Sequence, residues 1–175
     1  MKDELILKIA TEEDKEKVWE FRQEFIDKND NLAGDSSLLD YENYEDWLKR
    51  LKLYSSEETI PANKVPVTQF LTIRKSDNHL VGMINIRHRL NDVLLLRGGH
   101  IGDCVRPSER NKGYATEQLR LALNHCKSMG LDKVLITCKK ENIASAKTII
   151  KNGGILENEI EHDGVINQRY WITLK

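Results

Sequence analysis

Hydrophobic residues recur at two different spacings along this chain, and the spacing separates helices from strands. In residues 12–28 and 44–54, apolar side chains lie three or four positions apart, which predicts two amphipathic helices. Thr11 and Asp14 form a variant of the capping box at the start of the first helix. The Asn- and Asp-rich segment 29–37 between the two helices predicts a loop.

Most of the other hydrophobic positions alternate with polar ones or form short runs bounded by turn residues, which is typical of strands. We expect strands at residues 5–9, 65–73, 79–88, 99–105, 133–138, 155–160 and 166–174, and further helices at 116–129 and 144–151. The stretch between residues 105 and 133 is long enough for a right-handed crossover, so the strands flanking it should be parallel. The pattern predicts a mixed α/β (α+β) fold, with a mostly antiparallel sheet of about seven strands, one central parallel pair and about four flanking helices.

Composition narrows the class of protein. The 175 residues, 39% of them hydrophobic, suit a single domain spanning residues 1–175. A net charge of −1 argues against attraction of the whole molecule to nucleic acid or to an anionic membrane. No apolar run approaches the ~20 residues that cross a bilayer, and the N-terminal segment turns acidic before a signal-peptide core could form. Three cysteines without C-x-x-C spacing favour reduced thiols and a cytoplasmic location, and no histidine spacing predicts a metal site.

One polar turn, residues 105–116, carries the features of an anion site between a predicted strand and a predicted helix. Main-chain N–H groups in the first turn of a helix have no partner within it, and the helix dipole adds positive charge there. Gly113 and Ala115 allow close approach of a phosphate, and Arg110 and Lys112 supply positive charge. The turn lacks the signatures of a nucleotide P-loop and of a dinucleotide fingerprint. It therefore predicts a pyrophosphate ligand held without a metal.

The residues Arg110-Asn111-Lys112-Gly113-Tyr114-Ala115 after a strand resemble motif A of the GNAT acetyltransferase superfamily. Asn142 and Ser145, followed by Lys151-Asn152-Gly153-Gly154, are similar to the next segment of that family. The predicted order of elements also agrees with the family fold over essentially the whole chain. The resemblance implies the GNAT fold, with the parallel pair splayed apart, and an acetyltransferase that uses acetyl-CoA or another acyl-CoA as cosubstrate.

The resemblance also implies how the residues of the turn bind the cosubstrate. Main-chain groups of Cys104 and Val105 would pair with the pantetheine arm, and an amide there would polarise the thioester carbonyl. The amides of residues 112–116 would hold the pyrophosphate. The complete predicted binding set is Cys104, Val105, Arg110, Asn111, Lys112, Gly113, Tyr114, Ala115, Thr116, Asn142, Ser145, Lys147 and Lys151, with the last two lysines near the adenosine phosphates.

For catalysis, the resemblance implies direct attack of a primary amine on the thioester in a ternary complex. A general base on the strand 99–105 would deprotonate the amine, and the candidates are His100 and Asp103. Strand alternation places these two side chains on opposite faces, so at most one should line the cleft. Where many relatives have a Tyr that protonates the departing thiolate, this chain has Ile149, which leaves Tyr170 or solvent for that step.

The acceptor implied by the resemblance is an amine of a small molecule or of a peptide, chosen by residues in the range 21–53. A second reading of the same residues is a CoA-binding or regulatory module that has lost turnover, because Ile149 replaces the acid and no base is evident. The resemblance is consistent with a homodimer formed through the C-terminal strands.

Overall fold

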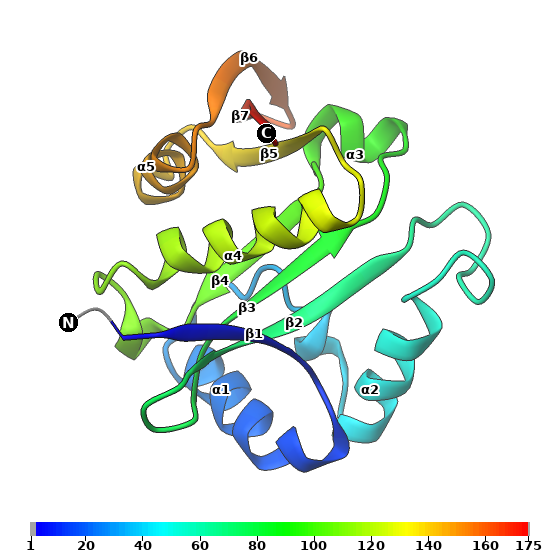
Figure 1. The fold of residues 1–175 in the computed structure, drawn as a ribbon, viewed down its shortest axis with the longest axis vertical. Coiled ribbons are helices and arrows are strands. Elements are labelled where there is room, and N and C mark those ends of the chain that lie inside the picture. Colours follow the sequence, from blue (N-terminus) through cyan, green and yellow to red (C-terminus); the bar gives the residue numbers. More distant parts are fainter. Residues whose placement is uncertain (1–2, 175) are drawn as a thin grey trace.

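The computed structural model describes residues 3–174, which form two antiparallel sheets with helices on both sides (Figure 1). The strands are β1 (Leu5–Ile9), β2 (Val67–Arg74), β3 (His79–Arg87), β4 (Ile101–Val105), β5 (Lys133–Lys139), β6 (Ile155–His162) and β7 (Val165–Thr173). The helices are α1 (Lys15–Asp27), α2 (Tyr44–Leu53), α3 (Asp92–Arg97), α4 (Tyr114–Ser128) and α5 (Ile143–Lys151), with 3-10 turns at Glu12–Asp14, Leu38–Asp40 and Pro107–Glu109. The predicted mixed α/β class is confirmed. Among residues 3–174, no helix is both long and apolar enough to span a membrane.

The strand ladders divide into a sheet of order β1-β2-β3-β4 and a sheet of order β5-β7-β6. β4 and β5 run in the same direction on the facing edges of these sheets (Figure 1). They are joined at one end, where the His100 N–H donates to the Leu135 carbonyl at 2.7 Å and the Leu135 N–H donates to His100 Nδ1 at 2.9 Å. No ladder continues from there toward Val105. The central pair is therefore splayed, and what was predicted as one sheet is two.

Helices cover both faces of the four-stranded sheet. α1 and α2 pack on one face around Phe21, Phe25 and Trp47, and Cys104 of β4 belongs to this cluster. α4 packs on the other face, where Leu119 joins a core shared with β5, β7 and α5. Because neighbouring residues of a strand point to opposite faces, Asp103 is directed to the α4 side.

The structure corrects three sequence expectations. A fifth helix, α3, lies between the strands expected at 79–88 and 99–105, where no helix is predicted, because the Asn91 side chain accepts the Leu94 N–H at 3.0 Å and caps it. Its six residues are too few to show helical periodicity. α4 begins two residues before the predicted start because Gly113, at a φ of 85°, occupies its N-cap. β4 begins at Ile101 rather than residue 99, since the chain before it turns to bond with β5.

Candidate functional site

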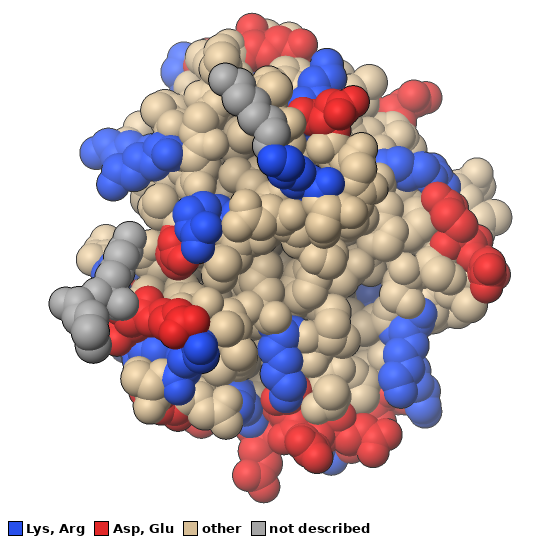
Figure 2. Space-filling view, viewed as in Figure 1, with Lys and Arg blue, Asp and Glu red and all other residues tan. Residues whose placement is uncertain are grey.

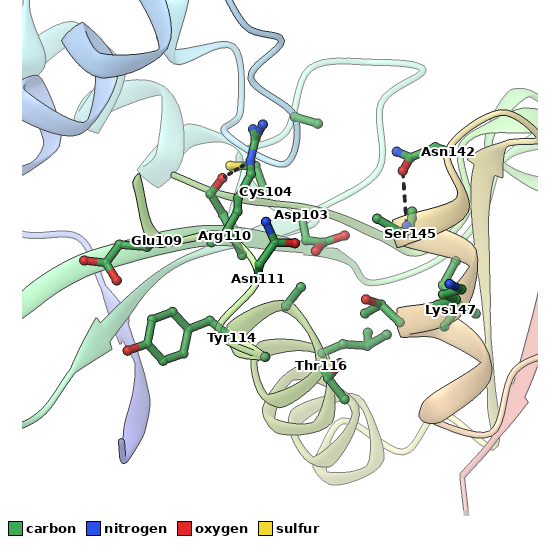
Figure 3. A pocket seen from close by; sticks show the side chains of 18 of the residues that line it. Asp103, Cys104, Glu109, Arg110, Asn111, Tyr114, Thr116, Asn142, Ser145 and Lys147 are labelled. Carbon is green, nitrogen blue, oxygen red and sulfur yellow. Dashed lines mark hydrogen bonds between the residues drawn. The ribbon is translucent and has the colours of Figure 1, made fainter. Parts of the chain in front are cut away.

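A cavity of about 630 Å³ lies where β4 and β5 separate, between the end of β4, the start of α4 and α5 (Figure 3). Four segments line it: the α1–α2 loop (Asp30, Asn31, Ala33), β4 (Asp103, Cys104, Val105), the β4–α4 turn with α4 (Glu109, Arg110, Asn111, Gly113, Tyr114, Ala115, Thr116, Leu119) and α5 with its cap (Asn142, Ala144, Ser145, Lys147, Thr148, Ile149, Lys151). All residues of the predicted binding set lie in this lining except Lys112.

The β4–α4 turn presents main-chain N–H groups to the cavity. Asn111 and Gly113 have φ values of 64° and 85°, in the left-handed region, and this lets the chain turn sharply into α4. Among the described residues, none accepts a hydrogen bond from the main-chain N–H groups of residues 111–116. These donors stand at the positive end of the α4 dipole, so the turn suits an anion.

The two cations of the turn are not directed at those N–H groups. Arg110 Nη1 lies 2.6 Å from Asp30 Oδ2, and Arg110 Nε donates to the Val105 carbonyl at 3.1 Å, which turns the side chain toward the α1–α2 loop (Figure 3). Lys112 Nζ lies 2.8 Å from Glu109 Oε2. Both charges are thus already paired with carboxylates.

Positive charge without a carboxylate partner lies on the opposite wall. Lys147 and Lys151 project from α5 and have no ion-pair partner among the residues the structure describes. The Asn142 side chain accepts the Ser145 N–H at 3.1 Å and caps α5 (Figure 3). The cavity is therefore bounded by the N-terminal ends of two helices, an arrangement that favours a negatively charged ligand.

Of the two residues predicted to pair with a pantetheine arm, only Val105 offers a free amide. The Arg106 N–H donates to the Val81 carbonyl on β3 at 2.9 Å. Main-chain groups of successive residues in an edge strand point to opposite sides, so the Val105 N–H points away from β3 and toward the cavity. Cys104 directs its main-chain groups to β3, and burial raises the pKa of its thiol, helped by the nearby Asp103 charge.

Asp103 is the acidic side chain of β4 that lines the cavity, and it is partly buried. Burial raises the pKa of its carboxyl from 3.8 to about 6. Gln118 Nε2 lies 3.5 Å from Asp103 Oδ2 and opposes that rise by donating to the charged form. A carboxylate with a pKa near neutrality, inside a cavity, suits a general base.

The structure leaves the other two predicted catalytic residues outside the lining of the cavity. His100 is buried, and its Nδ1 accepts the Leu135 N–H, so it joins the two sheets. Burial, together with the nearby charge of Arg87, lowers the pKa of His100 to about 4. Tyr170 is buried in the main core and donates its hydroxyl to Gln168 Oε1 at 2.7 Å.

Tyr114 lines the cavity with part of its side chain only. Its hydroxyl donates to Asp3 at 2.5 Å and accepts from Arg74 at 3.0 Å, so the ring points away from the centre of the cavity (Figure 3). Sequence reasoning missed the roles of Asp30 and Gln118. The spacing of hydrophobic residues could have indicated that Gln118 is buried. It lies four residues after Tyr114 and four before Ala122, on the buried face of α4.

Charge outside the cavity is mixed. On the face shown in Figure 2, acidic side chains gather over the part occupied by α1 and α2, and elsewhere both signs alternate. The described residues hold no group of three or more His, Cys, Asp or Glu side chains placed to bind a metal ion. The cavity is therefore the candidate anion site among the described residues.

Comparison with known proteins decides the family. The sequence matches the acetyltransferase (GNAT) domain family over residues 4–155. The chain belongs to the GNAT family. This GNAT protein is 25% identical to a GNAT-family acetyltransferase from Bacillus anthracis, with a TM-score of 0.62 and coverage of 99% and 97% of the two chains. Among proteins of curated function, none matches it in sequence.

Two more distant structures share the fold of this GNAT protein. One is the ribosomal L7/L12 α-N-protein acetyltransferase RimL in complex with coenzyme A, at 16% identity and a TM-score of 0.68, covering 97% and 94% of the two chains. The other is a mutant of the spermidine/spermine N-acetyltransferase SpeG from Vibrio cholerae, at 18% identity and a TM-score of 0.61, covering 98% and 95%.

Proposed function

We propose that this protein is an acetyl-CoA-dependent N-acetyltransferase, which transfers the acetyl group to a primary amine by direct attack in a ternary complex. The observation that carries the proposal is the row of unpartnered N–H groups at the start of α4, inside a cavity with two lysines on its far wall. Acetyl-CoA supplies the acyl group as an activated thioester.

The residues of the cavity fit the parts of such a cosubstrate. The amides of residues 112–116 hold the pyrophosphate, and Lys147 and Lys151 meet the adenosine phosphates. The Val105 amide donates to the pantetheine arm or to the thioester carbonyl along the free edge of β4. Arg110 and Lys112 contribute positive charge without contacting the pyrophosphate, because each is paired with a carboxylate of the protein.

Asp103 serves as the general base. At neutral pH its carboxyl, with a pKa of about 6, is mostly ionised and accepts the proton of the acceptor ammonium. The freed amine attacks the thioester carbon and forms the C–N bond, its nitrogen loses a second proton to solvent, the C–S bond breaks, and the thiolate leaves. Ile149, buried at the cavity wall, supplies no acid, so solvent protonates the thiolate.

The acceptor is an amine of a small molecule or of a peptide, and RimL and SpeG, whose names describe these two kinds of amine, support both. A homodimer through the C-terminal strands is supported by β6, a free sheet edge whose Ile155 is 73% exposed. A cytoplasmic location is supported by three buried free cysteines.

Two measurements on the purified protein test the proposal. Calorimetry should detect acetyl-CoA binding, and a thiol-reactive dye should report CoA release when polyamines, amino acids, aminoglycosides and peptide N-termini are offered in turn. No heat of binding at millimolar acetyl-CoA would refute the proposal.

Ile149 favours a second candidate, a CoA-binding or regulatory module without turnover. This module would give the same heat of binding but no thiol release with any acceptor. Thiol release with one amine, above the background measured without that amine, would exclude this second candidate.

A further inference from the structure

Gln118 is a polar residue of α4 whose amide nitrogen lies 3.5 Å from Oδ2 of Asp103 in the cavity lining. It is fully buried, and its amide contacts three strands of the four-stranded sheet. We propose that Gln118, anchored by Thr72, is a positioning residue that orients the Asp103 carboxylate toward the cavity and stabilises its ionised form. The proposal rests on the proposed function only in naming Asp103 as the base.

Hydrogen bonds hold the two ends of the Gln118 amide in opposite directions. Thr72 Oγ1 on β2 donates to Gln118 Oε1 at 2.5 Å. Gln118 Nε2 donates to the carbonyls of Met83 on β3 and Cys104 on β4, both at 3.3 Å, and lies 3.5 Å from Asp103 Oδ2. The oxygen therefore faces the hydroxyl, and the donor faces two main-chain carbonyls and, at a slightly longer distance, the carboxylate.

The sheet is shaped to admit this side chain. A Cβ atom on Gly82 would lie 2.4 Å from Gln118 Oε1, closer than any real contact allows. Gly82 pairs with Thr72 across β2 and β3. A glycine at this position thus leaves the room that the Gln118 amide occupies, directly beside its anchor.

No other donor competes for the carboxylate. Among residues 3–174, Gln118 Nε2 is the donor within hydrogen-bond distance of Asp103. The titratable groups that interact electrostatically with Asp103 are the thiols of Cys104 (β4) and Cys138 (β5). The charged side chains that share the cavity lining with it are Asp30, Glu109, Arg110, Lys147 and Lys151. Both thiols are neutral near pH 7, because burial raises their pKa values.

A hydrogen bond to the charged form lowers the pKa of a carboxyl, and its loss raises the pKa. Replacing Gln118 by Met keeps a linear side chain of similar length without the donor, and should move the titration midpoint of Asp103 upward by about one pH unit. Thr72→Val frees the Gln118 amide and should move the midpoint the same way by less, whereas Thr72→Ser keeps the hydroxyl and should titrate as wild type.

The test is a ¹³C NMR titration of the aspartate carboxyl carbons in the free protein, with Asp103→Asn assigning the signal. Leu123→Met, on the same buried face of α4 but outside the cavity lining, controls for repacking and should leave the midpoint unchanged. With an active acceptor, the acid limb of kcat/KM should shift with the NMR midpoint, while KM for acetyl-CoA stays constant.

A wild-type midpoint for Asp103 in Gln118→Met overturns the proposal. If Gln118→Met does not fold, a wild-type midpoint in Thr72→Val overturns it instead. Because the titration needs no substrate, these outcomes are separate from the proposed function, which fails on the absence of acetyl-CoA binding.

Discussion

At the scale of single residues, the proposed chemistry depends on Asp103, and the shape of the β4–α4 turn depends on Gly113. Asp103 combines burial with one long contact to an amide, and its pKa rises to about 6. Gly113 combines a φ of 85° with a place at the N-cap of α4. We expect a substitution at either position to change one property of the site and to leave the fold largely intact. Both residues are therefore useful for testing.

Asp103→Asn removes the proposed base without changing the size of the side chain. We expect kcat to fall by roughly 10²–10⁴-fold, with unchanged calorimetric affinity for acetyl-CoA. In the wild type, kcat/KM should rise with pH through about 6, because the ionised carboxyl is the active form. Full activity in the variant would assign the base elsewhere.

Gly113→Val forces a β-branched residue into the left-handed region and places a side chain at the proposed phosphate site. Calorimetry should show CoA binding weakened at least tenfold, roughly 1.4 kcal/mol. Gly130→Val is the matched control, since Gly130 has a φ of 83° with open space around it, past the other end of α4. Equal CoA affinity in both variants would mean that the anion binds elsewhere.

At the scale of elements, contacts of Arg110 link the β4–α4 turn to the α1–α2 loop. Arg110 pairs with Asp30 and also bonds to the end of β4. Gly34, with a φ of 66°, lies so close to β4 that a Cβ atom would come within 2.3 Å of the Gly102 carbonyl oxygen. The loop that should meet the acceptor is thus held against the strand that should meet the thioester.

Arg110→Gln and Asp30→Asn should therefore loosen the same segment. Hydrogen–deuterium exchange of residues 29–37 should accelerate to a similar degree in each variant and no further in the double variant, because both remove one interaction. Arg120→Gln breaks an exposed pair with Glu117 on α4 and should leave the loop unchanged. Additive effects of the two changes would show that they act independently.

At the scale of the whole molecule, two sheets are joined at one end and open at the other. The junction is the pair of hydrogen bonds between His100 and Leu135, and the open end is the cavity. The ring nitrogen that accepts the Leu135 N–H is unprotonated, so the junction requires neutral His100.

His100 should make stability depend on pH. Its folded pKa of about 4 lies below the ordinary 6.5, so its contribution is complete above pH 6.5 and is lost as the pH falls toward 4. The loss should reach about 3 kcal/mol in the free energy of unfolding, measured by urea denaturation. His100→Gln should flatten the pH profile over that range. His162→Gln, at a more exposed site, should retain the wild-type slope.

Interactions between near neighbours in the chain could be predicted from residue order alone. The capping pair Thr11–Asp14 and the polar turn ahead of α4 both depend on residues within a few positions of one another. Periodicity predicts the long amphipathic helices because it also depends on residues a few positions apart. It does not predict α3, because six residues do not complete two turns. The class of fold and the family motif followed from these local signals.

Contacts between distant segments had to come from the folded structure. Sequence left His100 and Asp103 as equal candidates, and the bond from Leu135 to His100 holds one of them outside the cavity. The carboxylate that engages Arg110 lies eighty residues earlier, at Asp30, and the hydroxyl that anchors Gln118 lies forty-six residues earlier, at Thr72. Charge pairing and burial depend on which segments meet in space, and a local pattern does not contain that information.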